Sequence, residues 1–75
     1  MNRIKFFRTK YGLTVKELSV KSDIAIGYLS DLENGNAKNP SLRTMQKIAA
    51  ALGQTVPDVF FPKEKEWVNF DSWKN

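Results

Sequence analysis

The fold is decided by residues 14–35, which read TVKELSVKSDIAIGYLSDLENG. Thr14 and Glu17 form a capping box, in which the hydroxyl and the carboxylate accept hydrogen bonds from free backbone amides where a helix begins. This helix is expected to end near Ser22, because the next residue, Asp23, tolerates the left-handed conformation of a tight turn. A helix followed at once by a tight turn is therefore predicted.

A second helix follows that turn. Ile24 is expected to enter the core behind the turn, and the next helix is predicted over residues 26–33. Leu29 and Leu32 are three residues apart and face inward on it. Asn34-Gly35 supplies the residues that end it. The two helices and their turn form one helix-turn-helix unit.

The preceding segment predicts a first helix. Asn2 can cap it, and the apolar residues Ile4, Phe7 and Tyr11 fall on one face. Gly12 supplies a left-handed residue at its end.

The segment that follows the unit predicts a polar loop over residues 36–40 and then a fourth helix. Ser41 caps this helix and Gly53 closes it. The expected apolar stripe consists of Leu42, Met45, Ile48, Ala49 and Leu52.

A fifth, short helix is predicted from a second capping pattern, Thr55 with Asp58. Pro57 is tolerated in its first turn, and Pro62 ends it. The residues expected to seal the core are Val56, Val59 and Phe60. No long alternation of apolar and polar residues indicates a sheet, so the prediction is an all-α, five-helix domain over residues 1–62.

Residues 63–75 differ in character and form a short aromatic tail. Four alternating charges are followed by large rings at three-residue spacing, Trp67, Phe70 and Trp73. One interpretation is that the rings fold back over an apolar edge left by Phe6, Phe60 and Phe61. The other is a segment that dimerises or binds a partner.

Composition excludes several classes of site. The 75 residues include no cysteine and no histidine, so disulfides, thiolate or imidazole metal ligands and the usual general bases are absent. We therefore expect no enzyme activity, no metal and no cofactor. The apolar runs are short and charges interrupt the N-terminus, so we expect no membrane span and a cytoplasmic protein.

The basic residues are concentrated before the tail. The chain has a net charge of +4. Up to Lys47 nine basic residues face four acidic ones, a net of +5. A basic excess of this kind is what attraction to phosphate requires.

Six segments in register resemble the lambda-repressor and Cro-like helix-turn-helix family, also called the XRE family. The resemblance covers residues 4 to about 61. The segments are Gly12-Leu13-Thr14, Glu17-Leu18-Ser19, Tyr28-Leu29-Ser30, Leu32-Glu33-Asn34-Gly35, Asn39-Pro40-Ser41-Leu42 and Ile48-Ala49-Ala50-Ala51-Leu52-Gly53.

The resemblance implies a site for double-stranded DNA. The second helix would cross the backbone, the third would enter the major groove, and two copies would read half-sites about one helical turn apart. The base-facing residues would be Ala25, Ile26, Gly27, Ser30 and Asp31. The phosphate-facing residues would be Thr14, Val15, Lys16, Tyr28, Asn34, Asn36, Lys38 and Asn39.

The third helix departs from what base reading usually requires. It lacks the Arg, Lys, Asn or Gln that read guanine or adenine. Ala25 and Ile26 can pack on thymine methyls, Asp31 can accept from a cytosine amino group but is repelled by phosphates, and Gly27 permits close approach. Val15 stands where relatives commonly carry a phosphate-binding Gln.

Two further departures concern the scaffold. Ser22 replaces an apolar residue and is expected either to underfill the core or to hydrogen-bond back to its own helix, and Asp23 replaces a turn Gly. Arg8 and Glu33 occupy positions at which relatives form a structural ion pair, and we expect that pair here.

The leading hypothesis is a homodimeric, sequence-specific DNA-binding transcriptional regulator, with repression as the expected mode. The alternative is a protein-interaction module of the same fold, an antirepressor, antitoxin or regulator partner. It would use Ile26, Tyr28 and Asp31, or the aromatic tail, because apolar and acidic residues suit a protein surface.

Overall fold

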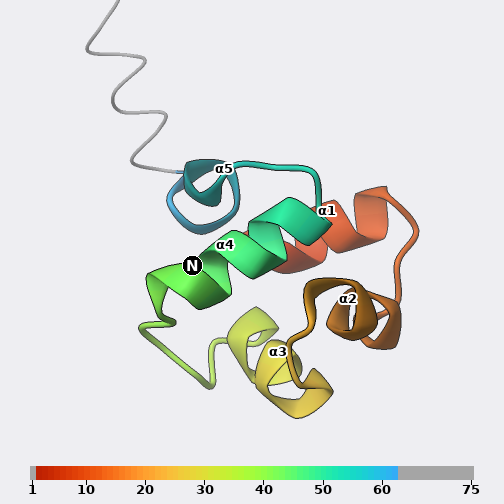
Figure 1. Cartoon of the computed structure of the whole chain (residues 1–75), viewed down its shortest axis with the longest axis horizontal. Coiled ribbons are helices and arrows are strands. Elements are labelled where there is room, and N and C mark those ends of the chain that lie inside the picture. Colours follow the sequence, from red (N-terminus) through yellow and green to blue (C-terminus); the bar gives the residue numbers. More distant parts are fainter. Residues whose placement is uncertain (1, 63–75) are drawn as a thin grey trace, which may run out of the picture.

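Five helices make up the part of the chain that the computed structural model describes, residues 2–62. No strand occurs within this range, which confirms the all-α prediction. The predictions for the tail fall on residues 63–75 and lie outside it. The helices are α1 (Ile4–Lys10), α2 (Val15–Ser22), α3 (Ile26–Glu33), α4 (Leu42–Ala51) and α5 (Val56–Phe60) (Figure 1).

Side-chain caps fix where three of the helices begin. At α2, the Glu17 amide donates to the Thr14 hydroxyl at 3.0 Å and the Thr14 amide donates to the Glu17 carboxylate at 2.8 Å. Thr55 and Asp58 form the same reciprocal box at α5. At α4, the Ser41 hydroxyl accepts from the backbone amide three residues later. All three predicted caps are confirmed, and each satisfies amides that a helix leaves unpaired.

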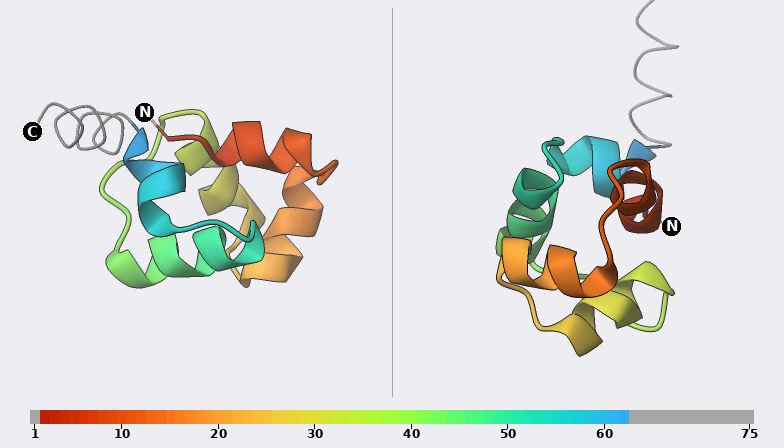
Figure 2. Two further views of the ribbon diagram at one scale, coloured as in Figure 1. Left: turned by 90° about the horizontal axis from the view of Figure 1, so that it is seen from above. Right: turned by 90° about the vertical axis from the view of Figure 1, so that its right-hand side faces the viewer.

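The core lies between the helices, and every helix contributes to it. α4 packs on both α2 and α5, while α1 packs on α5 and α2 on α3 (Figures 1 and 2). The most deeply buried side chains are Ile4, Leu18, Leu29, Leu32, Ile48 and Val59. No helix within residues 2–62 is long and apolar enough to cross a membrane.

Ser22 resolves the choice that the sequence left open. Its side chain is buried, and its hydroxyl donates to the Leu18 carbonyl at 2.7 Å. Hydrogen-bonding back to its own helix satisfies the hydroxyl without a tertiary partner.

The predicted cap of α1 is wrong by one position. The N-cap residue is Arg3, whose side chain makes no capping bond, and α1 begins at Ile4. The Asn2 side chain nevertheless accepts from the Ile4 amide at 3.1 Å, while its own amide donates to the Leu32 carbonyl at 2.8 Å. The bond to α3 holds Asn2 outside the helix.

Two predicted core residues are exposed. Leu42 leaves 59% of its surface in solvent. Since a helix turns about 100° per residue, each three-residue step falls roughly 60° short of a full turn, and two steps carry Leu42 away from the direction of Ile48. Tyr11 follows the end of α1 and stacks on Phe7 from outside, with ring centroids 6.5 Å apart.

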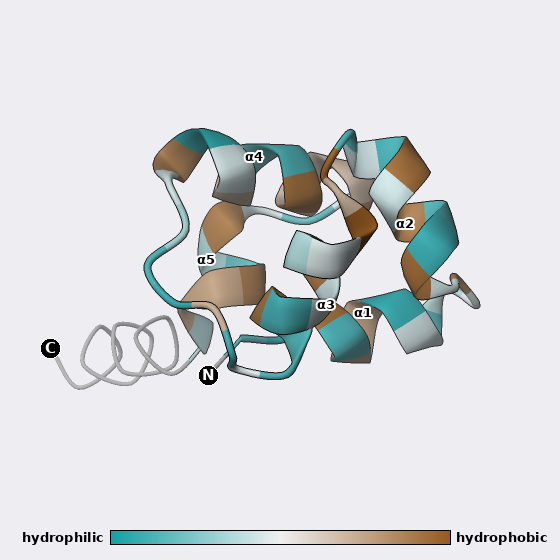
Figure 3. Cartoon of the chain, turned by 90° about the horizontal axis from the view of Figure 1, so that it is seen from below, coloured by the Kyte–Doolittle hydropathy of each residue, from teal (hydrophilic) through white to brown (hydrophobic). Residues whose placement is uncertain are grey.

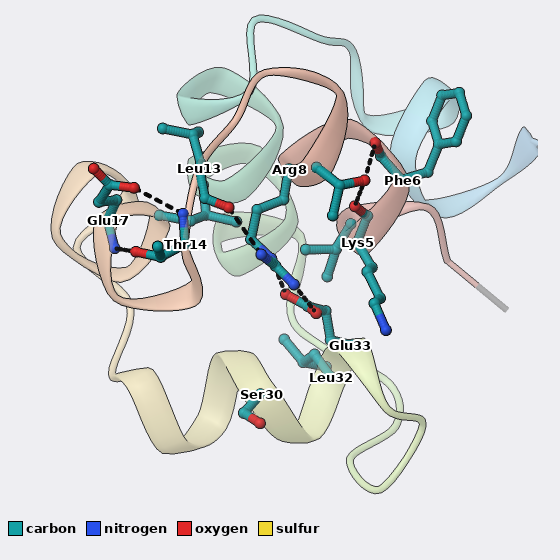
Figure 4. A network of polar contacts seen from close by, with 12 residues as sticks. Lys5, Phe6, Arg8, Leu13, Thr14, Glu17, Ser30, Leu32 and Glu33 are labelled. Atoms are coloured by element: carbon teal, nitrogen blue, oxygen red, sulfur yellow. Dashed lines mark hydrogen bonds and ion pairs between the residues drawn. The ribbon is translucent and has the colours of Figure 1, made fainter.

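An ion pair ties α1 to α3. Arg8 Nε and Nη2 donate to the two oxygens of Glu33 at 2.8 and 2.9 Å, and Nη1 donates to the Leu13 carbonyl at 2.8 Å (Figure 4). Only 13% of the Arg8 side chain and 4% of the Glu33 side chain are exposed. Because the hydrogen bond to Glu33 stabilises the charged guanidinium, it raises the pKa of Arg8 above its ordinary value.

Removing one partner of this pair should destabilise the fold. We expect Glu33→Ala to lower the free energy of unfolding by about 3 kcal/mol, because it leaves the Arg8 charge shielded from water and unpaired. Replacing both partners with apolar residues, Arg8→Met with Glu33→Leu, should recover much of that loss. Urea unfolding monitored by circular dichroism measures both the single and the double variant.

The pair between half-buried Lys47 and exposed Asp23, whose charged atoms are 3.7 Å apart, supplies the control. Lys47→Ala should cost less than about 1 kcal/mol, as is usual for surface pairs. An effect of Glu33→Ala as small as that of Lys47→Ala would contradict the structural role of the Arg8 pair.

Candidate nucleic-acid interface

The turn between α2 and α3 is held by local hydrogen bonds. Asp23 adopts the left-handed conformation at φ 60°, as predicted. The Ser19 hydroxyl donates to the Ile24 carbonyl at 2.6 Å, and the Ile24 amide donates back to the Ser19 carbonyl at 3.2 Å. With Ile24 buried behind the turn, these bonds set the direction in which α3 leaves α2.

The proposed base-facing residues lie on an accessible face of α3. Ala25, Gly27 and Asp31 are exposed, Ser30 is half-buried, and Ile26 leaves 49% of its surface in solvent. The other face of α3 carries the buried Leu29 and Leu32. The packing of α3 therefore turns the proposed residues away from the core.

The beginning of α3 carries no charged side chain, and two of its residues, Ala25 and Gly27, are small. Ala25 occupies the N-cap and offers no side-chain acceptor to the first amides of the helix. A Cβ added at Gly27 would meet nothing within 4 Å. Hydrophobic and weakly polar residues dominate the first half of α3, and its carboxylates lie in the second half (Figure 3). A polyanion can therefore approach the first turn more easily than the last.

The proposed phosphate-facing residues come from three segments: the beginning of α2, the exposed side of α3 with its C-cap, and the loop between α3 and α4. Most are exposed. Val15 is the exception, because its half-buried side chain packs against the core. Only its backbone amide is suited to a phosphate. The exposed members are Thr14, Lys16, Tyr28, Asn34, Asn36, Lys38 and Asn39.

Two of these residues also contribute to the fold. The Asn34 amide donates to the Ser30 carbonyl at 3.0 Å, which holds it at the end of α3. Asn39 adopts a left-handed backbone conformation at φ 54°, directly before Pro40. Local backbone geometry thus fixes part of the loop that carries Lys38.

The carboxylate of Glu17 repels anions near the beginning of α2. Its carboxylate accepts from Thr14, and hydrogen bonds from the Thr14 backbone and side chain lower the pKa of Glu17. The group is therefore negatively charged at neutral pH. The Glu17 carboxylate accepts from the Thr14 amide, which would otherwise be available to a phosphate. Lys16 must therefore offset the negative charge of the neighbouring Glu17 when a phosphate approaches.

Some residues that position the site were not singled out from the sequence. Ser19 braces the turn, and the Leu13 carbonyl receives Arg8 beside the capping box of α2 (Figure 4). The Ser19 bond was recoverable, since serine commonly bonds to nearby backbone. The bond from Arg8 to the Leu13 carbonyl depends on tertiary structure, so no local sequence pattern predicts it.

Comparison with known proteins places the chain among helix-turn-helix regulators. The family model described as Helix-turn-helix matches residues 4–59. The HTH-type transcriptional regulator DdrOP3 of Deinococcus deserti is 42% identical over 57 residues, covering 76% of this chain and 43% of DdrOP3. The chain thus spans less than half the length of that relative.

Two solved structures share the fold. A crystal structure of SinR, the master regulator for biofilm formation, in complex with DNA has a TM-score of 0.70 at 37% identity, covering 72% of this chain and 86% of that one. A structure of the SinR protein/SinI protein complex has a TM-score of 0.77 at 31% identity, covering 93% and 72%.

The fold, the capped α2 and the exposed α3 define a helix-turn-helix protein. The chain belongs to the lambda-repressor and Cro-like, or XRE, helix-turn-helix family.

A substitution at Gly27 tests whether this exposed position of α3 accepts a side chain without loss of stability. Because the site is open, Gly27→Ala should raise the free energy of unfolding by about 1 kcal/mol through better helix propensity. Chemical denaturation measures this change.

Gly53 provides the matched control, since a Cβ there also meets nothing, yet its φ is +67°. Gly53→Ala should destabilise the protein, because alanine is strained in that conformation. Loss of stability in Gly27→Ala would show that α3 is held differently.

Proposed function

We propose that this chain is a sequence-specific transcriptional regulator that binds double-stranded DNA and acts as a repressor. In this proposal α3 enters the major groove and α2 crosses the phosphate backbone. The observation that carries the proposal is the exposed, uncharged beginning of α3, held by the hydrogen-bonded turn that follows α2. Family membership and the DNA complex of SinR support it.

Phosphate contacts supply most of the affinity in this proposal. Lys16 at the beginning of α2 and Lys38 in the α3–α4 loop are exposed cations within the proposed phosphate-facing set. Backbone amides at the beginning of α2 and the polar side chains of the loop add neutral contacts. These groups position the domain on DNA without reading its sequence.

Base selection rests on a small group of contacts. Ile26 and Ala25 are placed to pack on thymine methyls, and Ser30 can donate or accept. Asp31 is exposed and suits a cytosine amino group, although phosphate repulsion limits its approach. We therefore propose modest selectivity with a preference for thymine opposite the first turn of α3.

The proposed acting form is a homodimer whose two α3 helices read half-sites about 34 Å apart. It works by binding in the cytoplasm, where the DNA is, and catalyses no reaction.

Neutralising a proposed phosphate contact should weaken binding to all duplexes alike. We expect Lys16→Gln and Lys38→Gln each to reduce the slope of log K against log salt by about 0.9, because one fewer counterion is released. Fluorescence anisotropy with a labelled genomic fragment, repeated over a range of salt concentrations, measures both slopes.

Lys10→Gln is the matched control, because Lys10 is an exposed lysine at the end of α1 outside the proposed set. It should leave the slope nearly unchanged. Salt-insensitive binding, or equal effects of all three variants, would contradict the proposed interface.

Neutralising Glu17 should have the opposite effect. Glu17→Gln removes a negative charge in the first turn of α2 but keeps an oxygen that can accept from the Thr14 amide. We expect DNA affinity at low salt to rise roughly threefold, because one repulsion with the phosphates disappears. The same anisotropy titration tests this, and a fall in affinity would show that α2 does not face the backbone.

A second candidate function is binding of a protein through the same α3 face. Exposed Ile26 and Tyr28 beside Asp31 favour it, as does the protein complex known for SinR. A pull-down from cell extract, run beside a gel shift with mixed genomic fragments, separates the two. Capture of a partner that requires Ile26, without any shifted duplex, would favour the second function.

A further inference from the structure

An apolar groove lies on the side of the molecule where the described chain ends. Its volume is about 570 Å³, within the usual range of ligand pockets. The N-terminal segment, the α3–α4 loop and the end of α5 meet there (Figure 2). Its apolar walls are Leu32, Ala37, Pro40, Met45, Phe60 and Phe61.

The last described residues form one wall of this groove. Phe61 lines it and leaves 42% of its surface in solvent, and Pro62 follows directly. Residues 63–75 are thus attached at the edge of the groove.

The attached sequence has the composition that the groove suits. Trp67, Phe70 and Trp73 supply three large rings, and the four charged residues 63–66 supply a polar spacer in which the chain can reverse direction. The rim adds the Lys38 ammonium, which can lie over an aromatic face, and the Asn39 side chain, which can accept from an indole N–H.

Attachment favours the chain's own segment over that of a second copy. A segment joined by a short spacer is present at an effective concentration in the millimolar range. The tail residues carry equal numbers of positive and negative charges, so they do not repel a basic rim as a cationic segment would.

We propose that this groove binds the aromatic segment 67–73 of the same chain and that the bound segment braces the α3–α4 loop. Lys38 and Asn39 lie both on the groove and in the proposed phosphate-facing set. The second half of the proposal therefore rests on the proposed function, whereas docking itself does not.

Tryptophan emission tests the docking directly, because both tryptophans of the chain lie in this segment. In the 75-residue chain we expect emission shifted to the blue of free tryptophan, with reduced acrylamide quenching, independent of protein concentration. Phe61→Ser in the groove and Phe70→Ser in the segment should each shift emission toward the red. Val20→Ser, an exposed residue of α2 outside the groove, should not.

The other outcomes overturn the proposal. Water-exposed emission in every variant excludes docking. A blue shift that grows with concentration while sedimentation shows a doubled mass assigns the groove to a second copy instead.

The bracing of the α3–α4 loop is tested separately, by measuring DNA affinity. Phe70→Ser should weaken binding to a duplex about threefold or more, because the loop loses its preorganisation. Unchanged affinity of Phe70→Ser for the duplex overturns the bracing of the loop. If the unmodified protein binds no duplex at all, the proposed function is overturned instead. The docking of the tail is then still decided by the tryptophan emission.

Discussion

The Arg8–Glu33 ion pair links the elements that present the rest of the site. Its guanidinium spans the last residue of α3 and the Leu13 carbonyl, directly before the capping box of α2. One side chain on α1 thereby relates the end of α3 to the beginning of α2. Asn2 adds a second bond, from the N-terminal segment to the Leu32 carbonyl of α3. α1 and the residues before it therefore help to set the geometry of the proposed DNA-facing surface, although they contribute little to that surface themselves. Shielding from water makes the pair costly to break rather than a large net source of stability.

Architecture and base reading rest on different residues in this protein. The turn geometry, the caps and the buried leucines fix where α3 lies. The side chains that α3 presents are short, apolar or acidic, so they supply few of the paired hydrogen bonds that distinguish bases. The proposed affinity comes from neighbouring segments, and Glu17 reduces part of it. Lys38 lines the groove, so the proposed docking site for the tail lies beside the proposed phosphate contacts of the loop.

The sequence predicted those parts of the fold that local chemistry controls. Thr14 with Glu17, Thr55 with Asp58, and left-handed Asp23 each leave a pattern within a few residues, and the structure confirms them. Leu42 was wrongly placed because two three-residue steps along α4 turn it away from Ile48. Tyr11 and Asn2 were wrongly placed because the exposure of a ring and the start of a helix also depend on packing between distant segments. The DNA-facing residues stay a prediction: exposure shows which of them are accessible, but base contacts depend on a partner surface that neither sequence periodicity nor the isolated domain contains.

In the proposed interface, α3 and its flanking segments form the DNA-facing surface. Amide chemical shifts of the isotopically labelled 75-residue chain, recorded as a duplex selected from random sequence is added, test this surface residue by residue. We predict shifts concentrated at the first residues of α2, at 25–31 in α3 and at 36–39 in the loop, with α5 little changed. Shifts centred on α5 or α1, or no shifts with any duplex, would contradict this placement of the DNA-facing surface.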